Sequence, residues 1–357
     1  MSRRRKRKIG KGKRNRIILL IFLTFLFTSL TIKSGLVPKL FAKPLQNENK
    51  NNTSDDKSTS TNSEKIEKEE RENKFKELIE KSALSINKKQ IEIDRDLLNS
   101  KAVFIMDPET GEEIYSLEKD TVHFPASLTK IANAIVAIEN EPSSENLYVM
   151  GEELVDRMIM DDASMAGFFA GETLCFNDLL YGTMLPSGGE AAVALSEMAS
   201  GSEANHVNRM NELVEKLNLK QTHFANTSGL HDIANYTTAK EMAEIFRYSL
   251  KNPEFRELIT ASSYTTSNTE EHPEGIYLCY SLLNYQYENS IENAEFLGGK
   301  TGFTEEANFC LASLAKVLDK EYIIVTLDAK DNEYTGHPHF DDQHYILNKL
   351  KEASLSD

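Results

Sequence analysis

Cysteine is scarce in this sequence, and the usual phosphate-binding patterns are missing. The chain has 3 cysteines among 357 residues, an odd number that allows at most one disulfide bond. We interpret Cys175, Cys279 and Cys310 as buried free thiols. The chain contains no glycine-rich phosphate-binding loop and no internal repeat, which argues against the common nucleotide-binding and repeat folds. We therefore expect no nucleotide cofactor.

A histidine cluster near the C-terminus is the nearest approach to a metal site. His337, His339 and His344 stand close in sequence to Asp341 and Asp342. Their spacing fits no closed zinc pattern, and they precede a helix-like segment. We therefore predict no metal site.

Charge is divided unevenly along the chain. Ten of the first 16 residues are Lys or Arg and none is acidic, whereas the whole chain carries a formal net charge of −15. The segment 17–32 follows directly and contains no charged residue. A basic arm followed by an apolar segment is typical of membrane targeting. We interpret 1–16 as a cytoplasmic arm and do not predict binding to nucleic acid.

The apolar segment predicts a membrane signal-anchor over 17–37. A helix over 17–32 spans about 24 Å. Lys33 can reach the interface, and residues 34–37 extend the segment towards the roughly 30 Å hydrocarbon core. The positive-inside rule then sends the rest of the chain across the cell membrane. The alternative is a cleavable signal with Leu40-Phe41-Ala42 as its cleavage site, which would give a secreted protein.

The segment 38–93 is expected to form a disordered tether. Residues 46–72 are Asn, Ser, Thr, Lys and Glu with almost no apolar residue, a composition that cannot bury enough surface to fold alone. Phe75, Leu78, Ile79 and Leu84 allow a short helix near its end. We place the folded domain at 94–357.

Within this domain the expected elements run in the order strands, helices, strands. A hairpin is predicted over 101–118, with its turn at 107–111. Helices are expected over 174–200 with a break at 186–189, and over 205–217 and 238–250. Strands are expected over 307–316 and 321–329. This order predicts a mixed sheet covered by helices, in which the first and last strands are neighbours.

The segment 123–140 carries the first chemically informative pair of residues. Ser127 and Lys130 are three residues apart, so on a helix their side chains can touch. A helix start also provides backbone N–H groups and the positive end of the helix dipole, which suit a nucleophile. A separate apolar stripe anchors the helix in a core; it consists of Leu128, Ile131, Ala132, Ile135 and Val136.

The Ser-x-x-Lys pattern is weak evidence by itself. It also begins at Ser54, Ser85, Ser116 and Ser313. The first two lie in the expected tether and at its end, and the last two lie in expected strands, where residues three apart face opposite sides. Only Ser127 has a helical setting.

Two further signals accompany this pair. Gly298-Gly299 precedes Lys300-Thr301-Gly302 near an expected strand, an arrangement suited to hold an extended peptide with a terminal carboxylate. The alternative interpretation of this segment is a glycine-rich turn with an exposed lysine. The other signal is Ser187, in the loop between two expected helices.

Three segments of this chain resemble, in the same order, the three motifs of penicillin-binding serine enzymes. They are Ser127-Leu-Thr-Lys130, Ser187-Gly-Gly189 and Lys300-Thr-Gly302. Segments 124–130, 178–182 and 224–232 are similar to the low-molecular-mass D-alanyl-D-alanine carboxypeptidases within that group. The resemblance covers about 98–350. It implies an α+β fold of the β-lactamase/transpeptidase type, with an antiparallel-rich sheet flanked by helices and a helical subdomain. We expect no C-terminal β domain.

The resemblance implies an acyl-enzyme mechanism. Ser127 would attack the carbonyl between two terminal D-alanines, and Lys130 would accept the hydroxyl proton. Lys300 would help to keep Lys130 neutral. Ser187 would relay a proton to the leaving D-alanine.

The resemblance also implies how substrate is held. Thr301 would bind the substrate carboxylate, beside Gly302 and Gly189, and the backbone N–H groups of Ser127 and Phe303 would form the oxyanion hole. The expected ligands are peptidoglycan stem peptides and β-lactam antibiotics, and no cofactor is implied.

Gly189 is the clear departure, because the family usually carries asparagine there. That amide contacts the lysine and the substrate backbone, so its absence puts turnover in question. One alternative is therefore a non-catalytic or very slow binder of penicillin and peptidoglycan. Another is a serine β-lactamase, for which Glu172 and Glu190 are available carboxylates. We expect 226–232, including His231, to be a structural loop.

Overall fold

The computed structural model describes residues 91–141, 146–280, 290–331 and 335–355. All of them belong to one compact unit. The expected arm, the signal-anchor and nearly all of the tether lie outside the described residues, so the domain boundaries stay predictions. Within the described part of the chain, no helix is both long and apolar enough to cross a membrane.

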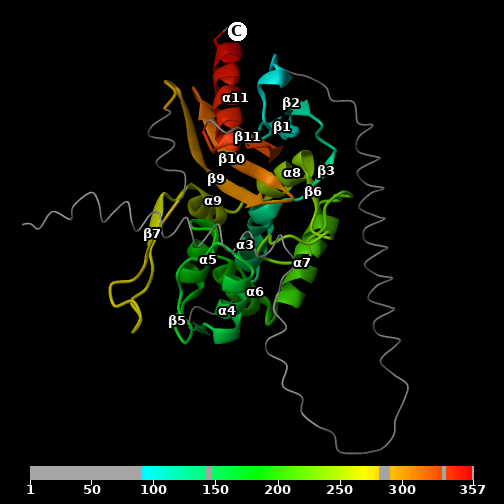
Figure 1. Ribbon diagram of the computed structural model, residues 1–357. Coiled ribbons are helices and arrows are strands. Elements are labelled where there is room, and N and C mark those ends of the chain that lie inside the picture. Colours follow the sequence, from blue (N-terminus) through cyan, green and yellow to red (C-terminus); the bar gives the residue numbers. More distant parts are fainter. Residues whose placement is uncertain (1–90, 142–145, 281–289, 332–334, 356–357) are drawn as a thin grey trace, which may run out of the picture. The chain divides into compact units, whose positions relative to one another are not determined.

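A five-stranded sheet forms one layer of this unit (Figure 1). Its order is β2-β1-β11-β10-β9, and every pairing is antiparallel. The strands are β1 (Ala102–Met106), β2 (Glu113–Leu117), β9 (Ala294–Thr304), β10 (Asn308–Val317) and β11 (Lys320–Ala329).

The order of the sheet confirms one prediction and corrects another. The first strand, β1, pairs with the last, β11, as expected. The sheet is not mixed, however. Short turns join β1 to β2 and link β9, β10 and β11 in sequence, and such turns can join only antiparallel strands.

Helices cover both faces of the sheet. Along β1, Val103 and Ile105 belong to the apolar cluster with α11 (Pro338–Ser354). The intervening Phe104 belongs to the cluster that contains α8 (Ala239–Ser249). Because strand side chains alternate between faces, a strand covered on both sides is apolar throughout. The predicted helix start at Thr238 is confirmed, since its hydroxyl accepts the Glu241 N–H at 3.1 Å.

The remaining helices form a second region below the sheet in Figure 1. They include the predicted pair α5 and α6, separated by a loop at 185–188. Their bounds are α3 (Thr129–Glu139), α4 (Glu152–Met160), α5 (Phe176–Met184), α6 (Gly189–Ser200), α7 (Glu203–Lys216) and α9 (Pro253–Thr260).

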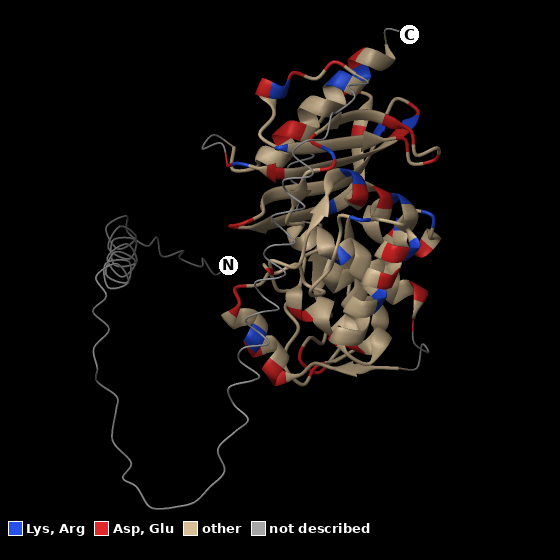
Figure 2. Cartoon of the chain, turned by 90° about the vertical axis from the view of Figure 1, so that its right-hand side faces the viewer, with Lys and Arg blue, Asp and Glu red and all other residues tan. Residues whose placement is uncertain are grey.

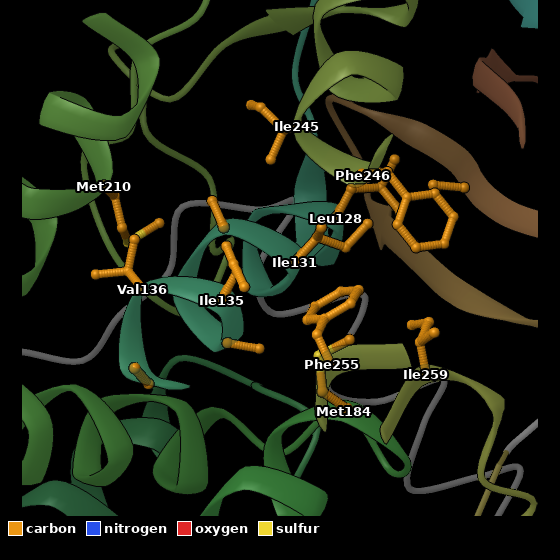
Figure 3. Close-up of a cluster of buried hydrophobic side chains, with 14 of the residues drawn as sticks. Leu128, Ile131, Ile135, Val136, Met184, Met210, Ile245, Phe246, Phe255 and Ile259 are labelled. Carbon is orange, nitrogen blue, oxygen red and sulfur yellow. The ribbon is translucent and has the colours of Figure 1, made fainter. Parts of the chain in front are cut away.

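Helix α3 lies at the centre of this region and packs against α5, α6, α7, α8 and α9. Figure 3 shows its apolar side chains among those of its neighbours, including Phe255 and Met184. The predicted stripe is buried, but burial extends around almost the whole helix. The Nδ2 amide of its buried Asn133 donates to Ala192 O and Thr227 O at 3.1 Å each, while Asn133 Oδ1 has no partner among the described residues. A helix enclosed on all sides needs such internal partners.

Three two-stranded ribbons complete the described part of the chain, together with a 3-10 helix, η1 (Arg95–Leu97). Most charged residues lie towards the outside of the unit, on the face drawn in Figure 2. The ribbons pair β3 (Val122–His123) with β6 (Thr237–Thr238), β4 (Tyr148–Val149) with β5 (Thr173–Leu174), and β7 (Ser263–Thr265) with β8 (Tyr277–Cys279).

The three cysteines are free thiols, but they are not all buried. Cys310 is buried in β10, Cys175 is half-buried and Cys279 is exposed. Cys279 faces solvent because β8 buries only alternate residues, here Leu278. The expectation of buried thiols is therefore correct only in part.

Candidate active site

Ser127 lies just before α3. The expected first turn of this helix is a separate 3-10 helix, η2 (Ala126–Leu128), and α3 begins at Thr129. Ala126 has φ +47°, a left-handed conformation that residues with a Cβ rarely adopt. Lys130 Nζ donates a hydrogen bond of 3.1 Å to Ser127 Oγ. The two side chains therefore touch, as their spacing predicts, while their catalytic roles stay a prediction.

Lys130 is suited to accept a proton from this hydroxyl. Its side chain is buried, and burial lowers its pKa to about 7, against the opposing charge of Glu190. Nζ also donates to Ser228 O. A lysine with such a pKa is neutral about half the time at pH 7. It can therefore serve as a general base at neutral pH.

Lys300 is buried and interacts electrostatically with Lys130. Burial lowers the pKa of Lys300 well below its ordinary value, and the charge of Lys130 lowers it further. Burial is also the largest cause of the lowered pKa of Lys130, and repulsion between two ammonium groups disfavours charge on both. Lys300 Nζ donates to Thr301 O at 3.0 Å.

Gly302 allows β9 to approach Ser127 closely. A Cβ at this position would lie 2.9 Å from Ser127 N and 3.0 Å from Ala126 Cβ. Any side chain would therefore push β9 away from η2. The neighbouring Thr301 is half-buried and Phe303 is exposed. This packing places the strand that carries Lys300 beside Ser127, and the oxyanion hole at Ser127 N and Phe303 N stays a prediction.

The loop with Ser187 supplies an unpartnered hydroxyl. Ser187 has φ +66°, and its buried Oγ has no hydrogen-bond partner among the described residues. A hydroxyl in this state is free to exchange a proton with a ligand. The structure shows no bond from Ser187 Oγ to Ser127 or Lys130 within the described part, so its relay role also stays a prediction.

Gly189 is the first residue of α6, and its missing side chain leaves no empty space. A Cβ would lie 2.9 Å from Ala163 Cβ and 3.1 Å from Met158 Sδ. The Gly189 N–H donates to Ser164 O at 2.7 Å. The chain after α4 therefore fills the space into which a side chain at 189 would extend.

The loop at 226–232 contributes more than the predicted scaffold. Asn226 Oδ1 accepts the Gly229 N–H at 2.8 Å, which holds the loop in shape. Gly229 has φ +81°, and a Cβ there would lie 2.1 Å from Ala126 O. Ser228 O contacts Lys130 directly. Sequence reasoning missed this contact because a backbone carbonyl has no sequence signature. His231 Nδ1 lies 3.8 Å from Glu306 Oε2.

Glu190 was also outside the predicted site. Its Oε1 accepts backbone N–H groups from Ala166 at 2.7 Å and Gly167 at 2.9 Å. Its Oε2 is buried without a partner among the described residues. Burial raises the pKa of this carboxyl, and the backbone donors oppose the rise. The only available sequence signal was its position directly after Gly189.

The other Ser-x-x-Lys patterns make different contacts. Ser116 Oγ and Lys119 Nζ both donate to the carboxylate of Glu113, at 2.8 and 2.5 Å. Ser313 Oγ donates to Gln343 Oε1 at 2.5 Å. The patterns at Ser54 and Ser85 lie outside the described residues.

The C-terminal histidines pack among aromatic rings. Burial lowers the pKa of His339 to about 3, and its ring stacks on Phe309 with centroids 5.0 Å apart. Among the described residues, no group of three or more His, Cys, Asp or Glu side chains could hold a metal ion.

Comparison with known proteins gives a consistent result. A family model described as D-alanyl-D-alanine carboxypeptidase matches residues 88–331. A D-alanyl-D-alanine carboxypeptidase of Streptomyces sp. strain K15 is 29% identical over 230 residues, which cover 59% of this chain and 75% of that protein. A D-alanyl-D-alanine carboxypeptidase of Bacillus subtilis is 28% identical over 235 residues, covering 64% of this chain but only 57% of that protein.

Solved structures show the same similarity. The crystal structure of the Streptomyces K15 DD-transpeptidase superimposes with a TM-score of 0.62 at 26% identity, covering 72% of this chain and 98% of that one. The crystal structure of a D-alanyl-D-alanine carboxypeptidase from Mycobacterium tuberculosis has the same TM-score at 22% identity, over 73% of this chain and 92% of that one. The predicted fold type is confirmed.

Proposed function

Because this chain belongs to the D-alanyl-D-alanine carboxypeptidase family, we propose that it removes the terminal D-alanine from peptidoglycan stem pentapeptides through an acyl-enzyme on Ser127. One observation carries the assignment of roles. Lys130 Nζ lies 3.1 Å from Ser127 Oγ, and burial lowers the pKa of this lysine to about 7. A neutral amine at hydrogen-bond distance from a hydroxyl is what activation of a serine requires.

In the first half of the reaction, neutral Lys130 takes the hydroxyl proton while Ser127 Oγ bonds to the carbonyl carbon. The peptide C–N bond then breaks as Ser187 passes its proton to the amine of the leaving D-alanine and takes up the proton that Lys130 removed from Ser127. The carbonyl oxygen gains negative charge during the attack, which the N–H groups of Ser127 and Phe303 would stabilise.

In the second half, water attacks the ester, and Ser127 regains its proton as the shortened peptide leaves. Thr301 would hold the carboxylate of the substrate, and this negative charge would in turn favour the protonated form of the buried Lys300 amine. A β-lactam would acylate the same serine when its ring amide opens. Its amine stays attached to the adduct, so no leaving group clears the site for water.

The assignment can be tested on the full-length chain in detergent. We expect it to release D-alanine from a pentapeptide ending in D-Ala-D-Ala and to form a covalent adduct with labelled penicillin. Ser127→Ala should abolish both while the thermal midpoint is retained. Undiminished labelling of this variant would show that Ser127 is not the nucleophile.

The same assay separates the alternatives. A stable adduct without D-alanine release would indicate a binder without turnover, for which Gly189 is the supporting observation. Rapid hydrolysis of penicillin would indicate a β-lactamase. Adding an amine acceptor would reveal peptide transfer, the activity for which the similar Streptomyces K15 DD-transpeptidase is named.

We also propose that residues 17–37 hold the domain at the outer face of the cell membrane. The support is the sequence alone, namely the basic arm before an uncharged apolar segment. A flexible tether over 38–93 would have an end-to-end distance of roughly 40 Å. Fractionation of cells expressing the full chain should place it in the membrane, with the domain accessible to external protease. Recovery of a shortened chain in the medium would instead indicate a cleaved signal.

A further inference from the structure

Asp328, near the end of β11, has no role in the proposed reaction. Phe309 pairs with Ala329 and Leu311 pairs with Thr326, so Cys310 alone lies opposite Leu327 and Asp328. Two residues against one define a β-bulge, which re-aims the side chains of the bulged strand. Asp328 has φ +55°, in the left-handed region that residues with a Cβ rarely adopt.

The carboxylate of Asp328 is largely buried and bonded at both oxygens. Oδ2 lies 2.7 Å from Lys101 Nζ and 3.4 Å from His123 Nδ1. Oδ1 accepts a hydrogen bond of 2.7 Å from Asn308 Nδ2. The side chains of Asp328 and His123 are 12% and 9% exposed, so solvent screens their contact little. Burial raises the pKa of Asp328, but the bonds from His123 and Lys101 lower it by more, and the carboxyl is ionised at neutral pH.

These partners come from different segments of the site. His123 ends β3, four residues before Ser127. Asn308 begins β10 at the hairpin turn and pairs with Thr304, four residues after Lys300. One carboxylate thus joins the segment that leads to the nucleophile and the hairpin that carries Lys300. A second contact joins the same two segments, because Cys310 Sγ of β10 lies 3.8 Å from Phe124 O.

We propose that Asp328 is a positioning residue that sets the placement of Ser127 relative to the Lys300 strand. This inference rests on the proposed function for its kinetic consequence. The approach of the two segments is close, since a Cβ at Gly302 would already contact Ser127 N. A small displacement of the hairpin therefore changes the geometry in which Ser127 meets a carbonyl held by β9, and reaction rates fall steeply with such displacements.

The test replaces Asp328 by asparagine in the full-length protein. Asp328→Asn keeps an acceptor for Asn308 but removes the charge that binds His123 and Lys101. We expect the rate of acylation by labelled penicillin to fall at least about 10-fold, with the thermal midpoint retained. A crystal structure of the variant should show the hairpin at 294–308 displaced relative to 123–130.

Two control variants separate positioning from general charge effects. Asp319→Asn removes one carboxylate from the exposed turn at the other end of β10 and β11, and should leave the rate within about twofold. Lys101→Met removes the most exposed partner, whose side chain is 52% exposed, and keeps the bonds to His123 and Asn308. Its rate should stay within about threefold.

Three results would overturn the inference. They are an unchanged acylation rate in Asp328→Asn, a loss that merely follows the unfolded fraction, or an equal loss in Lys101→Met. If the unmodified chain neither binds penicillin nor releases D-alanine, the proposed function fails. The positioning role is then judged by the crystal structure, and an undisplaced hairpin would refute it.

Discussion

Replacing Glu190 by glutamine tests the electrostatic account of Lys130. Glu190 is the one charge that raises the pKa of Lys130 against the effect of burial. Glutamine has almost the same shape, and its Oε1 can accept the N–H groups of Ala166 and Gly167 that now bond to Glu190 Oε1. Its Nε2 would replace Oε2, which has no partner among the described residues. The substitution therefore removes charge with little change in packing.

The expected size of the effect follows from the fraction of neutral Lys130. With a pKa of about 7, about half of the molecules hold neutral lysine at pH 7 and about a tenth at pH 6. At the ordinary pKa of 10.5, only about one molecule in 3,000 would do so at pH 7. Burial thus increases the amount of active base more than about 1,000-fold.

Glu190→Gln lowers the pKa of Lys130 further, so the acidic limb of the rate profile should move to lower pH. At pH 6 the variant should acylate faster than the unmodified chain, by at most about 10-fold, because about a tenth of the unmodified lysine is already neutral. At pH 8 the two rates should agree, since Lys130 is mostly neutral in both. The assay is the rate of acylation by labelled penicillin between pH 5 and pH 9.

Glu197→Gln is the matched control. It removes the same charge from the same helix, where Glu197 accepts a hydrogen bond of 2.6 Å from Tyr148 OH, and it should leave the limb in place. The reasoning is refuted if the rate has no acidic limb near pH 7, or if Glu190→Gln leaves the limb where it is or moves it to higher pH.

Two glycines give further predictions. Gly189→Asn alone should destabilise the protein by about 1–3 kcal/mol through overpacking against Ala163. The double variant Gly189→Asn, Ala163→Gly should recover this stability in thermal denaturation. The double variant should also release D-alanine faster than the unmodified chain. An equally stable single variant would contradict the packing argument. Gly229→Ala should destabilise by about 1–3 kcal/mol or more, because its φ is +81° and its Cβ would lie 2.1 Å from Ala126 O. Denaturant unfolding measures this loss, and a change below about 0.5 kcal/mol would show that the loop moves freely away from Ala126.

Local patterns predicted most of the elements correctly. The contact between Ser127 and Lys130 follows from their spacing on adjoining helical turns, which depends only on backbone geometry. The hairpin of β1 and β2 follows from its turn residues and flanking apolar runs. The signal-anchor and tether remain predictions, because they lie outside the described residues.

Contacts between distant segments were not predictable in the same way. The prediction that Lys300 helps to lower the pKa of Lys130 stays a prediction, while burial lowers the pKa of both amines to an extent that the packing around them decides. The sequence shows the missing amide at Gly189 but not its surroundings, where Ala163 approaches from another loop. The contacts of the Ser228 carbonyl and of the Asp328 carboxylate exist only in the tertiary structure.

The sequence by itself determined the order of strands and helices, the contact between Ser127 and Lys130, and the resemblance that identifies the family. These depend on residue type and on separations of a few positions, which the backbone converts into fixed local geometry. The tertiary structure alone decided the pKa of Lys130 and the filling of the space at Gly189. Each of these depends on which segments exclude water from one another, and that is a property of the packed chain rather than of any one stretch of it.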